Sequence, residues 1–221
     1  MTIPKLLLEV QNRRSDIIQL TSDLIKIPTI NPPGTNYREI CEFLSKRLKK
    51  SGFDVDIIRA KGALADTDKY PRFNLVARHE GTYSGPCIHF NSHIDVVDTG
   101  HGWTRDPFGG SIEGDKIFGR GSCDMKGGLA SSIVAAEVFI SIFPKYYGAI
   151  EISATADEET GGYGGVAWLA EKGYFNPKKV QSVIIPEPLN KDRICLGHRG
   201  VWWSEIETKG RVAHGLSLIH I

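Results

Sequence analysis

One histidine and several carboxylates stand at or near the ends of apolar, β-rich stretches of the sequence. His93 and Asp95 lie two residues apart in the run Asn91-Ser92-His93-Ile94-Asp95-Val96-Val97. Alternate residues of a strand point to the same side, so we expect the two side chains to lie together. In that geometry a carboxylate orients a metal-binding imidazole. For this segment alone, an ordinary polar pair near a strand end is the alternative interpretation.

Further acidic residues follow other predicted strands or a glycine-rich turn, namely Asp124, Glu158, Glu159 and Glu187. One imidazole with several carboxylates is a nitrogen and oxygen ligand set, which suits zinc, cobalt or manganese. A carboxylate has two oxygens and can bridge two ions about 3.5–4 Å apart, as in two-metal hydrolases. Of the adjacent pair Glu158 and Glu159, one would bind metal and the other would act as a general base on water.

Each acidic residue also has a structural interpretation. Asp124 could cap a helix that starts near Gly127, Glu158 and Glu159 could be a solvated loop pair, and Glu187 could belong to a rigid turn between two prolines. Their occurrence together, in this order and after these strands, favours the metal site.

The elements that would position these residues alternate along the chain. The spacing of apolar residues predicts helices over about 4–26, 37–48, 127–143 and 163–172. Strands are predicted over 53–57, 73–78, 87–91, 149–155 and 180–185, with a hairpin turn at 114–115. Such alternation predicts an α/β fold with a mixed, largely parallel sheet flanked by helices. Ligands of such sheets bind at the carboxyl ends of the strands.

Composition narrows the class of protein. The chain has 221 residues, 41% of them hydrophobic and 24% charged, and its net charge of +1 gives no reason to expect a nucleic-acid partner.

The four cysteines are far apart in sequence, which argues against a thiolate zinc site and favours buried free thiols: Cys41, Cys87, Cys123 and Cys195. No apolar run reaches the roughly 18 residues of a membrane helix, and no signal peptide is recognised, so we expect a soluble cytoplasmic protein without a membrane partner.

Five stretches, in order, resemble motifs of the M20 metallopeptidase family, in its acetylornithine deacetylase, succinyl-diaminopimelate desuccinylase and aminoacylase branch. These stretches lie at residues 92–97, 103–108, 119–128, 155–162 and 186–188, and the resemblance covers about residues 15–215. The resemblance implies a zinc-peptidase-like catalytic domain.

The resemblance also implies a role for each candidate residue and two Zn²⁺ or Co²⁺ ions per subunit. His93 and Glu187 would bind the first metal, Asp124 would bridge both, and Glu159 would bind the second. Asp95 would orient the metal-binding histidine, and Glu158 would be the general base and proton shuttle. A cis peptide bond is expected between Asp124 and Met125.

The implied activity is that of a metal-dependent amidohydrolase that removes an acyl group from an N-acyl amino acid or diamino acid. A di- or aminopeptidase that cleaves a short peptide is the alternative within the same chemistry. An inactive fragment that binds a metal or ligand is the alternative of another class. The family resemblance further implies a homodimer.

The resemblance divides the chain into an incomplete catalytic domain, residues 1–197, and the start of a small α+β lid or dimerisation domain, residues 198–221. His214 lies in a stretch that resembles the lid motif whose histidine reaches the partner subunit's active site and helps to hold the oxyanion, and an ordinary loop histidine is the alternative interpretation. After Gly215 the pattern departs from the family, and Leu216–Ile221 resembles a foreign junction. We therefore expect an incomplete second metal site and a poorly soluble or inactive product.

Overall fold

The computed structural model describes residues 3–190, 192–197, 200, 204, 206 and 207. The chain divides into two compact units, residues 1–188 and residues 189–221. The first unit holds every helix and strand found among the described residues, whereas the described residues of the second form none. The boundary between residues 197 and 198 that the sequence suggests for a lid domain stays a prediction.

A mixed five-stranded sheet forms the centre of the first unit. Its strands, in spatial order, are β1 (Asp54–Arg59), β2 (Phe73–Glu80), β6 (Tyr147–Thr155), β3 (Tyr83–His93) and β7 (Val180–Ile184). The strands β6, β3 and β7 are parallel, and β1 and β2 continue the sheet in antiparallel fashion. The predicted α/β class and mixed sheet are confirmed, with the parallel pairings gathered in one half.

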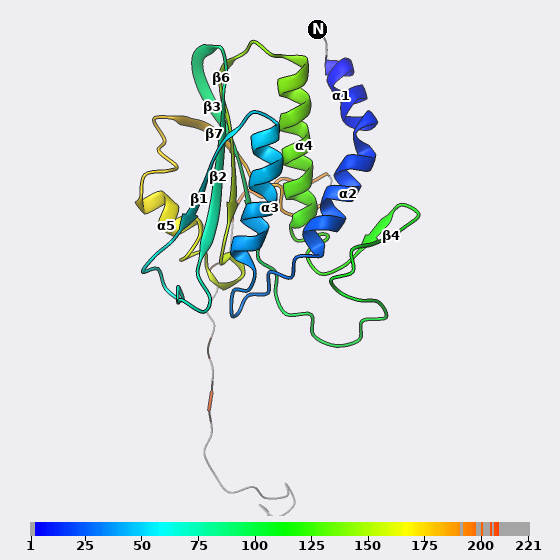
Figure 1. Ribbon diagram of the computed structural model, residues 1–221, viewed down its shortest axis with the longest axis vertical. Helices are drawn as coiled ribbons and strands as arrows, with labels where there is room; N and C mark the ends of the chain where they lie inside the picture. The colour runs from blue at the N-terminus through cyan, green and yellow to red at the C-terminus, as the bar shows by residue number, and fades with distance from the viewer. Residues whose placement is uncertain (1–2, 191, 198–199, 201–203, 205, 208–221) are drawn as a thin grey trace, which may run out of the picture. The chain divides into compact units, whose positions relative to one another are not determined.

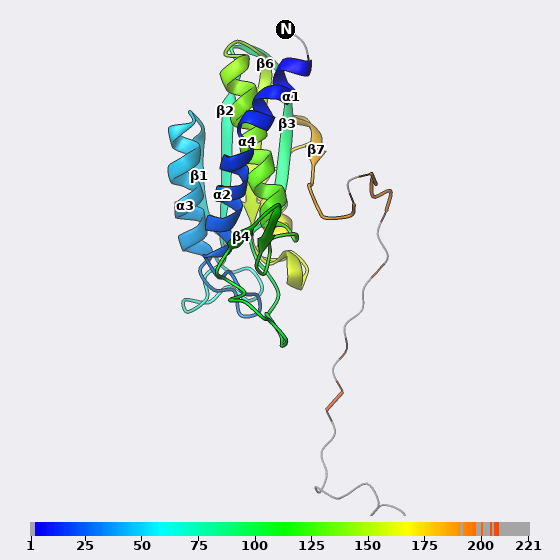
Figure 2. The same ribbon diagram turned by 90° about the vertical axis from the view of Figure 1, so that its right-hand side faces the viewer.

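Helices cover both faces of the sheet unequally (Figures 1 and 2). On one face lie α1 (Ile3–Asn12), α2 (Arg14–Ile25), α3 (Tyr37–Lys50) and α4 (Lys126–Ile142). The short α5 (Val166–Glu171) lies on the other (Figure 1). Helix α4 connects the parallel strands β3 and β6, which is the crossover that parallel pairing requires.

The hydrophobic core lies between the sheet and the α3–α4 layer. Helix α3 buries a stripe at helical spacing that includes Ile40, Leu44 and Leu48, and these side chains pack in one cluster with strand residues such as Leu75 and Ile152. Burial of each such side chain contributes about 1.5–3 kcal/mol. This layer therefore holds the strand ends in a fixed arrangement.

The predicted helix over residues 4–26 is two helices that meet at Arg13. The difference lies in burial, because α1 has no buried residue and its Leu7 and Leu8 are 59% and 57% exposed, whereas α2 buries Leu20 and Leu24. Arg13 also forms an ion pair with Glu137 of α4, 2.8 Å away. The position of the chain at Arg13 is therefore set by the packing of α2 and by this ion pair. It is not set by one continuous apolar stripe.

The connections just below the lower ends of the helices and strands in Figure 1 follow the carboxyl ends of the parallel strands. Pairing of His93 with Thr155, and of Phe90 with Ile184, brings the ends of β3, β6 and β7 to one edge of the sheet. The predicted hairpin is confirmed as β4 (Ser111–Glu113) and β5 (Lys116–Phe118). Within the described part of the chain, no helix is long and apolar enough to span a membrane.

Candidate metal centre

The predicted site residues meet at the carboxyl edge of the three parallel strands. His93 ends β3, and Glu187 follows β7. Glu158 and Glu159 form the short 3-10 turn after β6, and Asp124 lies just before α4. The structure thus brings together residues that are up to 94 positions apart in sequence.

The imidazole of His93 is buried, and its two nitrogens face different groups. Nδ1 donates to the backbone carbonyl of Asp95 at 2.9 Å. Nε2 faces the acidic side chains, 2.9 Å from Asp124 Oδ1, 3.5 Å from Glu187 Oε1 and 3.9 Å from Glu158 Oε2. Because the carbonyl accepts from Nδ1, Nε2 is the nitrogen available to a metal.

Asp95 orients the histidine by a different group from the one expected. Strand β3 ends at His93, so the two-residue alternation does not continue to Asp95, and the nearest Asp95 carboxylate oxygen is 3.6 Å from Nδ1. That carboxylate instead accepts from the backbone amides of Glu158 and Glu159, both at 3.1 Å, and from Asn31 Nδ2 at 2.8 Å. Asp95 therefore links the histidine to the turn that carries the two glutamates.

Asp124 occupies a position set by the start of α4. The peptide bond between Asp124 and Met125 is cis, as the resemblance predicts. Met125 is the residue at the N-terminal cap and no side-chain cap is formed, so Asp124 does not cap this helix. The buried Lys126 amine donates to the carbonyls of Leu24 and Ile27, which ties the beginning of α4 to the end of α2.

Glu187 approaches the cluster because α4 begins with small residues. A Cβ at Gly128 would overlap the carbonyl oxygen of Pro186, so a larger residue there would push the Pro186-Glu187 segment away. Gly128 of the predicted motif thus has a packing role beside the acidic cluster.

The electrostatics of the cluster favour a cation. Burial of the His93 imidazole lowers its pKa, but the hydrogen bond to Asp124 and the negative charges of Asp95 and Glu187 outweigh this and raise the pKa to about 11. Burial and the charges of Asp124 and Glu158 raise the pKa of Glu187 to about 7, against the lowering effect of the imidazole. Carboxylates that stabilise an imidazolium here would equally stabilise a divalent metal ion.

The donor set fits a transition-metal ion with nitrogen and oxygen ligands. Ligand atoms of His93, Asp124 and Glu159 all lie within 4.8 Å of one another, and Glu187 adds a further oxygen near His93. Such a set suits zinc, cobalt or manganese. The expectation of buried thiols is confirmed for Cys41 and Cys87 and is wrong for Cys123 and Cys195, which are exposed, and no cysteine is part of this ligand group.

Sequence reasoning missed the residues that support the glutamate turn. Asp157, immediately before Glu158, is buried and accepts from Tyr37 Oη and Arg72 Nε, each at 3.0 Å. Arg72 and Tyr37 come from distant parts of the sequence and belong to no recognised motif. The one available signal was Asp157 itself, a third acidic residue in Asp157-Glu158-Glu159.

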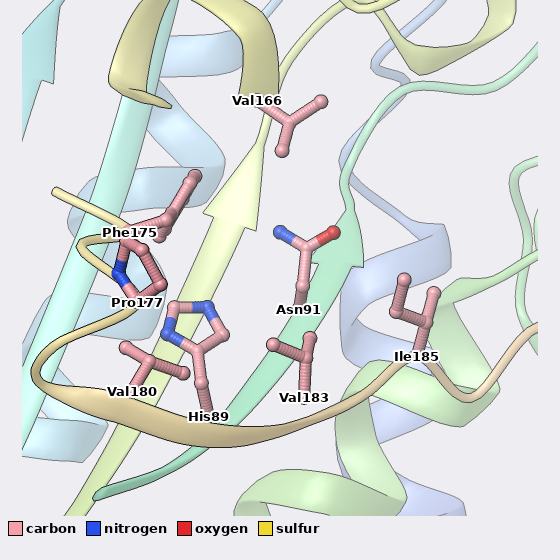
Figure 3. Close-up of a pocket in the computed structure, with 8 residues that line it drawn as sticks. All are labelled: His89, Asn91, Val166, Phe175, Pro177, Val180, Val183 and Ile185. Carbon is pink, nitrogen blue, oxygen red and sulfur yellow. The ribbon is translucent and has the colours of Figure 1, made fainter. Parts of the chain in front are cut away.

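A pocket of about 300 Å³ lies on the face of β3 that carries the side chains of His89 and Asn91 (Figure 3). His89 and Asn91 contribute its polar part, and the other lining residues are apolar: Val166, Phe175, Pro177, Val180, Val183 and Ile185. Both His89 nitrogens are engaged, with Glu151 at 2.7 Å and Ser153 at 2.8 Å, and Asn91 also donates to Ser153. Asn91 and Ile185 precede His93 and Glu187 by two residues, so the same two chain segments line the pocket and continue into the acidic cluster.

His214, the predicted oxyanion-binding residue, lies outside the described residues, and so does the Leu216–Ile221 segment. Their roles remain predictions from the sequence.

A family model described as peptidase family M20/M25/M40 matches residues 89–210, which is more than half of the chain. The chain belongs to this family. The match includes His93, Asp124, both glutamates of the turn and Glu187, so the structural cluster lies within the M20 region.

Curated relatives of this M20 chain include proteins named succinyl-diaminopimelate desuccinylase. The protein from Stenotrophomonas maltophilia is 32% identical over 206 residues, and that from Acinetobacter baumannii is 33% identical over 206 residues. Each alignment covers 90% of this chain and 51% of the relative. The chain therefore spans about half the length of these relatives.

Solved structures show the same fold. Human carnosine dipeptidase 1 matches with a TM-score of 0.68 and 19% identity, over 83% of this chain and 41% of that chain. Dug1p, a dipeptidase from Saccharomyces cerevisiae, matches with a TM-score of 0.68 and 20% identity, over 83% and 40%. At these identities the comparison establishes the catalytic-domain fold.

Proposed function

We propose that this chain carries the metal-binding part of an M20 amidohydrolase that removes an acyl group from an N-acyl diamino acid by a two-metal mechanism. The names of the relatives, succinyl-diaminopimelate desuccinylases at 32–33% identity, support a succinyl group as the first to test. Removal of an acetyl group from an N-acetyl amino acid would require the same chemistry at the amide bond.

The observation that carries this proposal is the convergence of His93, Asp124, Glu159 and Glu187 on one sheet edge, with Glu158 beside them. A solvated acidic loop would not place a buried imidazole with its free nitrogen toward several carboxylates. The arrangement supports a metal site more strongly than any one of the motifs does.

The proposed ligand roles come from the family resemblance, and the proximity of the donor atoms supports them. His93 Nε2 and Glu187 would hold the first metal, and Glu159 would hold the second. Asp124, whose ligand atom lies within 4.8 Å of those of both His93 and Glu159, would bridge them. Two such ions, when bound, lower the pKa of water and polarise an amide carbonyl. Zn²⁺ and Co²⁺ are both compatible with this ligand set.

Glu158 is the proposed general base. Its side chain is exposed and its Oε2 lies 3.9 Å from His93 Nε2, so it reaches the space in front of the cluster without belonging to the compact ligand group. Its amide is held by Asp95, which aims the side chain toward that space. Glu158 would accept a proton from water and then donate it to the leaving amine.

A substrate panel tests the proposal. Protein loaded with Co²⁺ is assayed with N-succinyl-diaminopimelate, N-acetylornithine, an N-acetyl amino acid and a dipeptide. Because this chain is expected to have an incomplete second metal site, the proposal predicts cleavage of acylated compounds, fastest for the succinylated one, by a form of the protein in which that site is complete. Faster cleavage of the dipeptide would favour the peptidase alternative, and bound metal without any turnover would favour the non-catalytic fragment. We also propose that the protein forms a homodimer and that His214 helps to hold the oxyanion in the active site of the partner subunit.

A further inference from the structure

We propose that Arg72 is a positioning residue, which acts through a buried ion pair with Asp157 to fix the turn that carries Glu158 and Glu159. The inference rests on the roles proposed above for those two glutamates. Arg72 lies just before β2, 85 residues before Asp157 in the sequence, and belongs to none of the motifs that mark the metal centre.

The ion pair is enclosed and geometrically fixed. Arg72 Nε donates to Asp157 Oδ2 at 3.0 Å, and both side chains are only 3% exposed. Arg72 Nη1 also donates to the carbonyls of Pro33 and Tyr70, both at 2.8 Å. The second carboxylate oxygen of Asp157 accepts from Tyr37 Oη at 3.0 Å. The planar guanidinium is thus held by two backbone segments and in turn fixes the carboxylate.

Asp157 is the residue from which the glutamate turn begins. Its φ of +61° lies in the left-handed region, which a non-glycine residue adopts when its surroundings hold it there. Its carbonyl accepts from the amides of Thr160 and Gly162. Fixing the Asp157 side chain therefore fixes the backbone that projects Glu158 and Glu159.

The surrounding chain leaves room for this pair. A Cβ at Gly164 would overlap the Asp157 carboxylate and the aliphatic part of Arg72, and a Cβ at Gly34 would lie 2.5 Å from Arg72 Nη1. Glycine at both positions lets backbone approach the pair from two sides and exclude solvent.

The turn is held from its other side as well. The amides of Glu158 and Glu159 donate to the two carboxylate oxygens of Asp95. Asp95 and the Arg72–Asp157 pair form two supports for one short turn, and loss of either should release it. Such supporting contacts around a metal site typically change metal affinity or activity about 10- to 100-fold when removed.

Amide hydrogen exchange measures the positioning directly and without metal. In Arg72→Met, the amides of Glu158 and Glu159 should lose protection beyond the loss caused by lower global stability. Arg47→Met is the matched control, because Arg47 also forms partly buried ion pairs, with Asp16 and Glu137, but contacts nothing in the cluster. Arg47→Met should lower global stability, and the protection of the Glu158 and Glu159 amides should fall only as far as that global loss requires.

Two gentler variants keep the test informative if Arg72→Met does not fold. Tyr37→Phe removes one hydrogen bond to Asp157 and keeps the ring, and Gly164→Ala displaces the pair without changing any charge. Both should expose the same two amides. Arg72→Lys, which keeps the charge but loses the planar fork, should give an intermediate effect.

The visible absorption spectrum of bound Co²⁺ gives a second readout. Arg72→Met should weaken Co²⁺ binding about 10- to 100-fold and change the spectrum, and Arg47→Met should do neither. Unchanged protection of Glu158 and Glu159 in Arg72→Met or the gentler variants would overturn the positioning role. If wild-type protein binds no Co²⁺, the proposed function fails, and the exchange measurement still decides the inference.

Discussion

At the scale of single residues, Asp95 connects the two halves of the candidate centre. Its carbonyl accepts from His93 Nδ1, and its carboxylate accepts from the amides of Glu158 and Glu159. One buried residue therefore sets both the direction of the imidazole and the position of the acidic turn. The carboxylate also accepts from Asn31, so the loop after α2 contributes to the site.

Replacement of Glu158 by glutamine should abolish amide hydrolysis and leave metal content nearly unchanged. The amide group is similar in size but does not accept a proton at neutral pH, and Glu158 lies outside the compact group of ligands. Turnover with the best substrate and metal content by elemental analysis are the two measurements. Loss of metal together with activity would show that Glu158 is a ligand rather than the base.

Asn31 should tolerate alanine better than aspartate. Asn31 Nδ2 donates to Asp95 at 2.8 Å and to Thr160 at 2.9 Å, within a buried setting. Asn31→Ala loses these bonds at about 1–3 kcal/mol, whereas Asn31→Asp places a second buried carboxylate against Asp95 and should cost more than about 3 kcal/mol. Urea unfolding compares the two, and equal stability would contradict the contact geometry.

The sequence was sufficient to predict that the acidic residues lie together. It was not sufficient to identify the residues that hold them in position. His93, Asp124, Glu158, Glu159 and Glu187 each follow a strand or a glycine-rich turn, and parallel strands bring such positions to one edge. The partners Asn31, Arg72 and Tyr37 come from other segments. Their contacts depend on loop conformations, including the left-handed Asp157, that no residue pattern predicts.

At the scale of elements, a partly buried cluster of ion pairs joins α2, α3 and α4. Arg47 of α3 donates to both carboxylate oxygens of Asp16, at 2.9 and 2.8 Å, and its Nη2 lies 2.6 Å from Glu137 Oε2. Arg13 contacts the same two carboxylates. This bidentate arrangement links α2, α3 and α4, three of the four helices that cover one face of the sheet.

Asp16→Asn should lower the free energy of unfolding by about 1 kcal/mol near neutral pH, a modest value because the cluster is partly exposed. The Arg47 hydrogen bonds hold the pKa of Asp16 well below its ordinary value of 3.8. Its contribution is therefore full above about pH 3.8 and is lost as the pH falls further below that value.

Urea unfolding of both proteins over a descending pH series checks this linkage. The stability difference between wild type and Asp16→Asn should narrow in acid. A difference that stays constant through the acid range would show that the carboxylate charge does not stabilise the native state.

Most elements were predictable because their apolar spacing is regular. Helix α3 and strand β6 occur where the pattern places them, with ends shifted by a few residues. The break at Arg13 was not predictable from spacing, because α1 and α2 differ in how deeply they are buried, which depends on the folded structure. The length of β3, which extends to His93, depends on its pairing with β6.

At the scale of the whole molecule, the centre joins segments that meet only after folding. The ligands come from the ends of β3, β6 and β7 and from the start of α4. A metal that binds this arrangement and not the unfolded chain must stabilise the fold.

Addition of Zn²⁺ should therefore raise the thermal midpoint. At about 100 times its Kd, a ligand specific for the folded state adds about 2.7 kcal/mol. Differential scanning calorimetry with and without Zn²⁺, followed by a chelator, measures the change. Stabilisation that survives in Asp124→Asn and His93→Ala would indicate binding somewhere else.

The central claim is that His93 and its acidic neighbours form a metal site, and titration of the protein with Co²⁺ tests it most directly. Wild type should bind Co²⁺ with a visible spectrum typical of nitrogen and oxygen ligands. His93→Ala should lose that binding, and His101→Ala, which removes an exposed imidazole eight residues away, should retain it. Equal Co²⁺ binding by His93→Ala and wild type would contradict the account.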